Sequence, residues 1–218
     1  MDAVRVALLR EVLAGTEWLR STRRFAGTLR TSVTRHQGGL LLVGSAAYEP
    51  WHLAAHLDDE AAWSGLPELS PTLVRHRVPP GAAPHLSVGL GRLEGVRRGE
   101  TLLVVTADAP GEGLLERVHD ARRGGATVLA LDGAGDAAAA ELRSLAHDTL
   151  SAPPVPAVPS PAAACDSTST ELDLDTVQHL VSAAAGENSP PPGHGRRRFR
   201  DRLARLADQL TAPPPPPW

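Results

Sequence analysis

Two histidines four residues apart are the side chains best placed to do chemistry in this chain. His52 and His56 lie in PWHLAAHLDDEAAW, a segment whose leading proline suits the first turn of a helix. Residues i and i+4 share one face of a helix, so the two imidazoles are expected one turn apart. Such a pair can hold a zinc ion, and a neutral imidazole can accept a proton near pH 7. The alternative is a pair of ordinary helix or interface residues, because two ligands without a third make a weak metal site.

The residues before the histidines predict a strand that leads into a loop suited to anions. Gly38-Gly39 forms a turn, and the unbroken apolar run 40–43 is typical of a strand buried on both faces. The small residues Gly44, Ser45 and Ala46 follow before the helix starts. Free backbone N–H groups at a helix N-terminus favour a negatively charged ligand.

A second strand, loop and helix follow the same plan. Residues 101–106 predict a buried strand, and the glycine-containing loop 107–113 leads into a predicted helix over 114–123. The remaining predicted strands are 72–78, 126–131 and 148–150, with a helix over 136–146 and a short, glycine-weakened helix over 85–96. The mixed apolar and basic residues of 72–78 place that strand near an edge. This alternation predicts a three-layer α/β/α sandwich around a five-stranded parallel sheet with right-handed crossovers.

Composition limits the classes of partner. The chain has 218 residues, enough for one α/β domain of roughly 150 residues with additions. A net charge of −3 gives no general attraction to nucleic acid, which we do not expect as a partner. The single cysteine, Cys165, excludes an intrachain disulfide and a cysteine-based zinc site. The sequence predicts no signal peptide and no transmembrane segment, and hence a cytoplasmic location.

Helical additions are predicted on both sides of the α/β domain, which we place at 37–152. Residues 1–36 predict N-terminal helices, 153–170 a Pro/Ala-rich linker, and 171–187 a C-terminal helix. Residues 188–218 predict a basic amphipathic helix followed by a proline-rich tail. We interpret that helix as a docking or self-association element, with membrane-surface or nucleic-acid contact as alternatives.

The ordered series of turns, strands and loops resembles sugar isomerase (SIS) domains, and among them the phosphoheptose isomerase type. The resemblance covers about residues 18–152 and rests on these stretches: Gly38-Gly39, 40–43, Gly44 to Ala47, Gly99-Glu100, 101–105, Gly125-Ala126 and His147-Asp148. It implies a flavodoxin-like sheet and a homodimer or homotetramer. It also implies a phosphosugar site at the carboxyl ends of the strands, built from hydroxyls and backbone amides.

The resemblance also implies roles for single residues. The substrate-binding positions would be Gly44, Ser45, Ala46, Thr106, Asp108, Gly111 and Gly113. Phosphoheptose isomerases carry a metal-binding His on the first domain helix, with a Glu one turn later that serves metal binding and proton transfer. The matching positions are His52 and His56, which makes both metal ligands and His56 the catalytic base. The family's Gln and His ligands on the last helix are echoed by Gln178 and His179, although with a different spacing.

The second loop departs from the family pattern, because Ala107, Asp108, Ala109 and Pro110 stand where serines are usual. Asp108 and Glu112 repel a phosphate, and Pro110 lacks an N–H donor. We therefore predict a diverged SIS-domain protein that binds a phosphosugar or other carbohydrate derivative without robust catalysis. The alternatives are an active aldose–ketose isomerase of the sedoheptulose 7-phosphate type, and a structural or partner-binding protein with a vestigial pocket. Zinc is the one cofactor that the sequence suggests.

The two tryptophans of the first domain helix have a separate interpretation. Trp51 and Trp63 stand near its two ends, about three turns apart. We predict that they contribute to the core or to subunit contacts, rather than forming a platform for a ligand.

Overall fold

The computed structural model describes residues 17–36, 38–133, 139–152 and 174–187. The N-terminal helix predicted before residue 17, the linker at 153–170 and the basic helix after residue 188 lie outside the described residues. Within them, no helix combines the length and the hydropathy that a membrane span requires.

Five parallel strands form one sheet, as the sequence predicts. Their bounds are β1 (Leu40–Gly44), β2 (Pro71–Val74), β3 (Thr101–Thr106), β4 (Thr127–Asp132) and β5 (Asp148–Ser151). The strand order is β2-β1-β3-β4-β5, and every neighbouring pair is parallel. This is the flavodoxin-like order, in which the chain reverses its direction of growth between β1 and β3.

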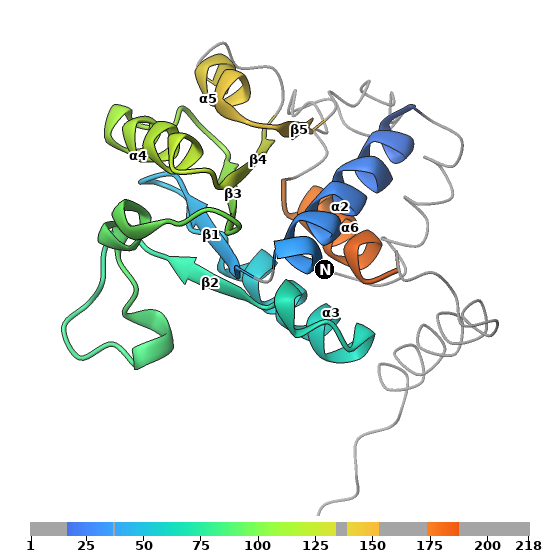
Figure 1. Ribbon diagram of the computed structural model, residues 1–218, viewed down its shortest axis with the longest axis horizontal. Coiled ribbons are helices and arrows are strands. Elements are labelled where there is room, and N and C mark those ends of the chain that lie inside the picture. Colours follow the sequence, from blue (N-terminus) through green and yellow to red (C-terminus); the bar gives the residue numbers. More distant parts are fainter. Residues whose placement is uncertain (1–16, 37, 134–138, 153–173, 188–218) are drawn as a thin grey trace, which may run out of the picture.

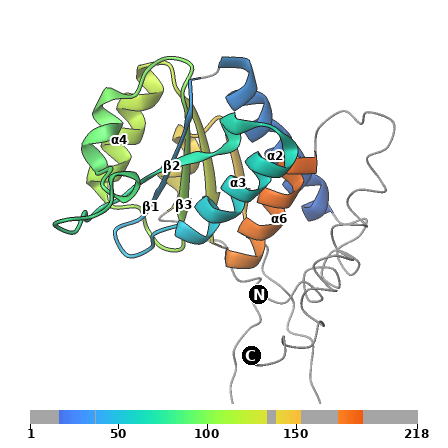
Figure 2. The same ribbon diagram turned by 90° about the horizontal axis from the view of Figure 1, so that it is seen from below.

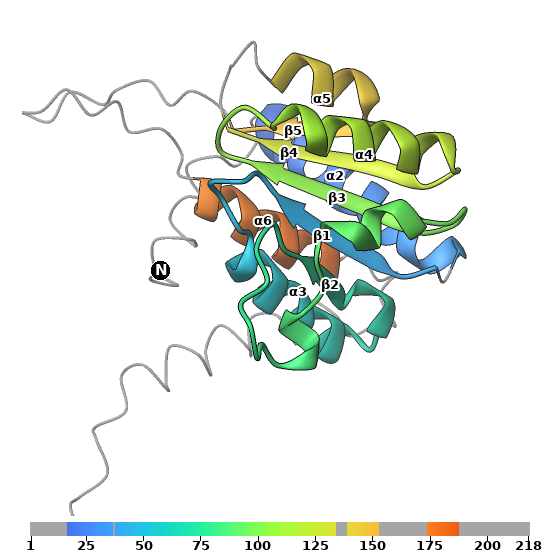
Figure 3. The same ribbon diagram turned by 90° about the vertical axis from the view of Figure 1, so that its left-hand side faces the viewer.

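Helices cover both faces of the sheet and complete the three-layer sandwich (Figures 1 and 2). One layer holds α2 (Glu17–His36), α3 (Trp51–Ser64) and α6 (Leu174–Glu187). The other layer holds α4 (Glu112–Arg123) and α5 (Ala140–Leu145), which lie together in front of the sheet in Figure 3. Of these helices, α3, α4 and α5 each return the chain to the start of the next parallel strand.

The strands are continuous apolar runs because both of their faces are buried. Successive strand residues point to opposite faces, so Leu40 and Leu42 join the core under α2, α3 and α6. Leu41 and Val43 join the core under α4 instead. All four side chains are at most 2% exposed. This two-sided burial explains why the run 40–43 shows no polar alternation.

The last helix, α6, follows the undescribed stretch 153–173 and is held by its own packing. Val177, Val181 and Ala185 are fully buried in the core that α2 and α3 share. Arg30 of α2 adds a hydrogen bond from Nη1 to the carbonyl oxygen of Ala185, at 3.0 Å. The helix therefore lies against both α2 and α3, although more than 100 residues separate it from either in sequence.

Two predicted segments differ in detail from the structure. The second strand ends at Val74 rather than at residue 78, and only Arg75 makes a further bridge, to Gly89. It is an edge strand, as predicted. The segment predicted as a helix over 85–96 forms two 3-10 helices, Pro84–Leu86 and Leu90–Gly95. Its glycines lower the propensity for a longer α-helix.

Candidate functional site

Three histidines from two helices meet at the carboxyl edge of the sheet. His52 and His56 occupy the first two turns of α3, and His179 lies in α6. The Nε2 atoms of His52 and His56 are 2.9 Å apart, and Nδ1 of His179 lies 2.9 Å from Nε2 of His56. The three nitrogens lie within 4.8 Å of one another. All three side chains are half-buried.

The donor set of this histidine cluster fits a divalent transition metal. Two nitrogens bound to one tetrahedral zinc ion are separated by about 3.3 Å, which is close to the 2.9 Å between the His56 nitrogen and each of the other two. The nitrogen of His56 also faces two others, and a ring nitrogen either donates or accepts a hydrogen bond but never does both. Hydrogen bonds alone therefore satisfy the cluster poorly, whereas one cation accepts the lone pairs of all three nitrogens.

Burial keeps the central imidazole ready for such a role. Desolvation lowers the pKa of His56 below its usual value of 6.5, and the neighbouring His52 lowers that pKa further. Asp59 acts in the opposite direction, but the net shift remains downward. His56 is therefore neutral near pH 7, the state in which imidazole binds a metal or accepts a proton.

Tyr48 connects this cluster to the loop after β1. Its hydroxyl donates a hydrogen bond to Oδ1 of Asp175 at 3.0 Å and accepts one from Nε2 of Gln178 at 2.6 Å. Gln178 is fully buried, and its Oε1 atom has no hydrogen-bond partner within the described part of the chain. Gln178 precedes His179 on α6, so the polar contacts of Tyr48 position the same stretch of α6 that carries the third histidine.

The loops after β1 and β3 meet through a single hydrogen bond. The hydroxyl of Ser45 donates to Oδ1 of Asp108 and accepts a bond from the backbone N–H of Tyr48 at 3.2 Å. Ser45 is 3% exposed, whereas Asp108 and Ala46 are exposed at the surface. Since β1 and β3 flank the point where the strand order reverses, these loops border the usual crevice for ligands in open α/β sheets.

The other predicted contact residues lie along the second loop and the start of α4. Thr106 ends β3 and is 1% exposed, and its Oγ1 atom has no hydrogen-bond partner among the described residues. Gly111 caps α4, and its carbonyl oxygen accepts the N–H groups of Leu114 and Leu115. Gly113 belongs to the exposed first turn of α4. The structure thus brings the two predicted loops together at one edge of the sheet.

Close packing fixes the loop after β1. A Cβ atom on Gly44 would lie 1.9 Å from the carbonyl oxygen of Tyr48 and 2.7 Å from Cδ of Pro50. The carbonyl oxygen of Gly44 is 2.9 Å from Nε2 of His76, which follows β2. Arg75 forms a two-point ion pair with Glu49. These contacts hold the loop, and through it the first turn of α3, in one conformation.

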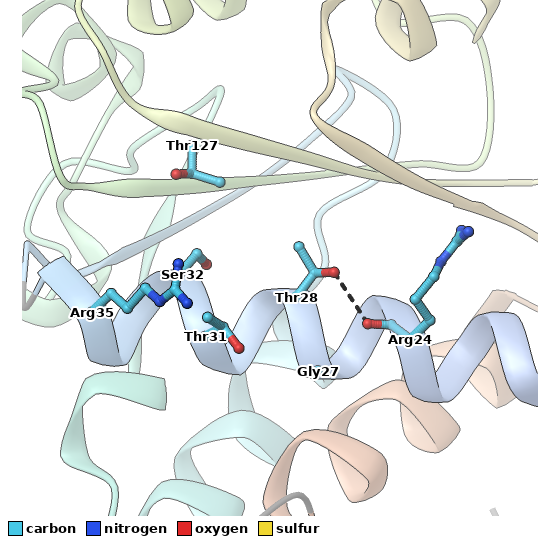
Figure 4. Close-up of a pocket in the computed structure, with 7 residues that line it drawn as sticks. All are labelled: Arg24, Gly27, Thr28, Thr31, Ser32, Arg35 and Thr127. Carbon is cyan, nitrogen blue, oxygen red and sulfur yellow. Dashed lines mark hydrogen bonds between the residues drawn. The ribbon is translucent and has the colours of Figure 1, made fainter.

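Two surface hollows in the described structure are lined by residues outside the histidine cluster and the two loops. One, of about 490 Å³, runs along α2 and reaches the first residue of β4 (Figure 4). Its lining includes Thr31, Arg35 and Thr127, while Thr28 and Arg24 at its other end contact Asp148. The second, of about 660 Å³, lies between α4 and α5. The first is at the amino end of β4, opposite to the edge where parallel sheets bind ligands, so we do not assign it a ligand.

Several site residues were not identified, or only weakly, from the sequence. His179 resembles a family ligand, but its spacing from Gln178 differs from that of the family. Tyr48 and Asp175 carried no signal, because their contact joins positions 127 residues apart. Helix periodicity shows that His179 and Asp175 share one face of α6, but it does not show which helix that face meets.

Comparison with known proteins gives a likeness in structure but none in sequence. No protein-family model matches the chain, and no curated protein matches it. A candidate sugar-binding protein from Salmonella typhimurium LT2 matches with a TM-score of 0.52 and 15% identity, over 96% of this chain and 54% of that one. The chain thus spans about half the length of that protein. At this identity the likeness shows a shared fold and nothing about activity.

Two further solved structures match with lower TM-scores. The sugar isomerase domain of an RpiR transcription factor from Sphaerobacter thermophilus has a TM-score of 0.47 and 17% identity, over 89% of this chain and 93% of that one. The Vibrio vulnificus NanR protein complexed with ManNAc-6P has a TM-score of 0.44 and 11% identity, over 96% of this chain and 73% of that one.

Proposed function

We propose that this chain binds a carbohydrate derivative, a phosphosugar or another sugar, at the carboxyl ends of β1 and β3, beside a divalent metal held by the histidine cluster. The observation that carries the proposal is the convergence of His52, His56 and His179 from two helices next to the paired loops. The sequence resemblance to SIS domains supports it. The Salmonella protein with the same fold is described as a candidate sugar-binding protein, which agrees with the proposal.

Zinc is the metal that this donor set favours. Neutral imidazoles suit zinc and other late first-row metals, and three protein ligands leave a fourth position for water or a ligand oxygen. A zinc ion there would supply a positive charge that polarises an oxygen of the bound molecule. The chain's own contribution is to orient the three rings and to keep His56 neutral by burial.

The paired loops would hold the polar groups of the carbohydrate. The backbones of Gly44 and Ala46 and the hydroxyl of Ser45 border one side of the crevice. Thr106 and the first turn of α4, with Gly111 and Gly113, border the other side. Hydroxyl-rich ligands suit such a border, because its exposed backbone groups and the exposed carboxylate of Asp108 can pair with sugar hydroxyls.

An active aldose–ketose isomerase of the phosphoheptose isomerase type is the second candidate. The lowered pKa of His56 favours it, because a base must be unprotonated at working pH. The same nitrogen of His56 cannot bind a metal and accept a proton at once, so the two roles compete. The exposed carboxylate of Asp108 in the second loop favours binding without robust turnover.

Metal content and ligand-dependent stability test the proposal directly. The purified full-length protein should contain about one zinc ion per chain, and zinc added after chelation should raise the melting temperature, because a ligand of the folded state stabilises it. His179→Ala should lower zinc affinity by more than about tenfold, since it removes one of three ligands. His119→Ala, a change of an exposed histidine on α4, is the matched control and should behave as the wild type.

The carbohydrate part of the proposal is tested by thermal shift against a panel of sugars and sugar phosphates, with the zinc-loaded protein. At least one member should stabilise the wild type, and His52→Ala should weaken that effect. The proposal fails if no member stabilises the protein and if His179→Ala binds zinc as well as the wild type does. Interconversion of an aldose phosphate and its ketose by the wild type, lost in His56→Gln, would favour the isomerase instead.

A further inference from the structure

A built-in carboxylate lies between the two loops that border the crevice. Asp108 accepts the hydrogen bond of the Ser45 hydroxyl, the single side-chain hydroxyl among the small residues Gly44 to Ala47. Ser45 is buried, and its hydroxyl is already engaged as the donor to Asp108 and as the acceptor of the Tyr48 N–H. An incoming phosphate would have to displace Asp108 to reach that donor.

The charges around the pair oppose a phosphate as well. The loops 45–50 and 107–111 contain Glu49 and Asp108 but no arginine or lysine. Arg75 and Arg117 contact the first loop and the start of α4, and both are engaged: Arg75 pairs with Glu49, and Arg117 donates to the carbonyl oxygen of Gly113 and pairs with Glu94. Within these two loops, a phosphate dianion beside Asp108 would meet a like charge with no arginine or lysine to offset it.

Acidic side chains of the chain also place negative charge near the start of α4. Glu112 is the acidic residue of its first turn, and Asp108 precedes the helix by four residues. The positive end of a helix dipole attracts an anion, and Glu112 already supplies a carboxylate in this first turn. Pro110 removes one backbone N–H from the same loop.

We propose that Asp108 determines specificity by excluding phosphate from the crevice between β1 and β3, so that the ligand there is a non-phosphorylated carbohydrate derivative. This inference rests on the proposed function and narrows its ligand class. Asp108 is exposed, and a carboxylate has more acceptor positions than the Ser45 hydroxyl fills. It receives a hydrogen bond from a hydroxyl or an ammonium group of the ligand.

Matched pairs of sugars test the inference by isothermal titration of the zinc-loaded, full-length protein. The probes are glucose and glucosamine, each with its 6-phosphate, and inorganic phosphate. The proteins are the wild type, Asp108→Ser, the near-isosteric Asp108→Asn, and the control Glu116→Gln, which removes an exposed carboxylate elsewhere on α4. Because Asp108 is exposed in a loop, both of its variants should fold.

The wild type should bind the unphosphorylated member of a pair more tightly. Asp108→Ser and Asp108→Asn should bind 6-phosphates or inorganic phosphate more than about tenfold more tightly than the wild type, because a like charge is removed. Glu116→Gln should retain the wild-type preference. A marked preference for glucosamine would assign an ammonium group as the donor to Asp108, and equal affinity for glucose would assign a hydroxyl.

The outcomes separate the inference from the proposed function. If the wild type binds 6-phosphates as tightly as the Asp108 variants do, the inference is wrong and the proposed function stands. An unchanged preference in both variants leads to the same conclusion. If no protein binds any of the probes, the proposed function fails, and this inference fails with it.

Discussion

The nitrogens of the histidine cluster bind protons, so the cluster should make the stability of the protein depend on pH. Burial lowers the pKa of His56 below 6.5, and His52 adds to that shift. The folded chain therefore binds fewer protons than the unfolded chain below that pH. The stability of the metal-free protein should be complete above about pH 6.5 and should fall as the pH drops towards the lowered pKa.

Chemical unfolding of the metal-free protein between about pH 8 and pH 5 measures this dependence. His56→Gln should lose less stability than the wild type as the pH falls, because it has no imidazole to protonate at that position. His119→Gln removes an exposed histidine and should follow the wild type. Equal slopes for the wild type and His56→Gln would contradict the prediction.

The hydroxyl of Tyr48 should contribute to stability out of proportion to its size. Tyr48→Phe removes one hydrogen bond to Asp175 and one from the fully buried Gln178, whose Nε2 keeps its contacts with Leu174 and Asp175. Losing these two hydrogen bonds costs about 1–3 kcal/mol, which should appear as a lower midpoint in urea unfolding. Ser144→Ala, which removes an exposed hydroxyl on α5, should cost less than about 0.5 kcal/mol. Equal midpoints for the two variants would show that the Tyr48 contacts add nothing.

Among the elements, the loop between β1 and α3 has the least tolerance for added volume. Gly44→Ala would place a methyl group against the backbone of Tyr48, which cannot move without shifting the start of α3. Such overpacking costs about 1–3 kcal/mol. Because His52 lies in the first turn of α3, zinc affinity should fall as well.

The matched control is Gly91→Ala, because a Cβ atom there would have no heavy-atom neighbour within 4 Å. Its melting temperature and zinc affinity should stay close to those of the wild type. If Gly44→Ala melts with the wild type and keeps its zinc affinity, the loop does not hold α3 in place.

The sheet could be predicted from the sequence because each buried parallel strand is one short apolar run. Strand β3 has its predicted bounds, β1 extends one residue beyond its predicted end to Gly44, and the strand count and sheet class are as predicted. The end of β2 at Val74 could not be predicted, because the next residue, Arg75, bridges to Gly89, a pairing that no local pattern in the sequence reveals.

Which helices pack against each other could not be predicted from the sequence, for a different reason. Apolar periodicity predicts that α6 packs on the domain, but it does not predict that α3 is its neighbour. That His179 lies beside His52 and His56 follows only from the tertiary contact between α3 and α6. The predicted metal, substrate and catalytic roles remain predictions, now with a third candidate ligand.

In the molecule as a whole, two large aromatic side chains of α3 are exposed to solvent. Trp51 is 66% exposed and Trp63 is 51% exposed, so the prediction that they could serve the core was wrong. Both faces of the sheet are already covered by helices, and the described core includes neither tryptophan. The remaining interpretation, subunit contact, stays a prediction.

We expect that the chain forms a homodimer or homotetramer in which the exposed surface of α3 takes part. Tryptophan is enriched at the centres of protein interfaces, where its large apolar surface is removed from water. Trp63→Arg would place a charge in such an interface and should shift the mass measured by light scattering towards that of one chain. Leu86→Arg changes another exposed apolar residue, in a 3-10 helix far from α3 in sequence, and should leave the mass unchanged.

A wild-type mass of about 23 kDa at all concentrations would contradict self-association. If the wild type is an oligomer and Trp63→Arg leaves its mass unchanged, the subunits meet through a surface other than α3.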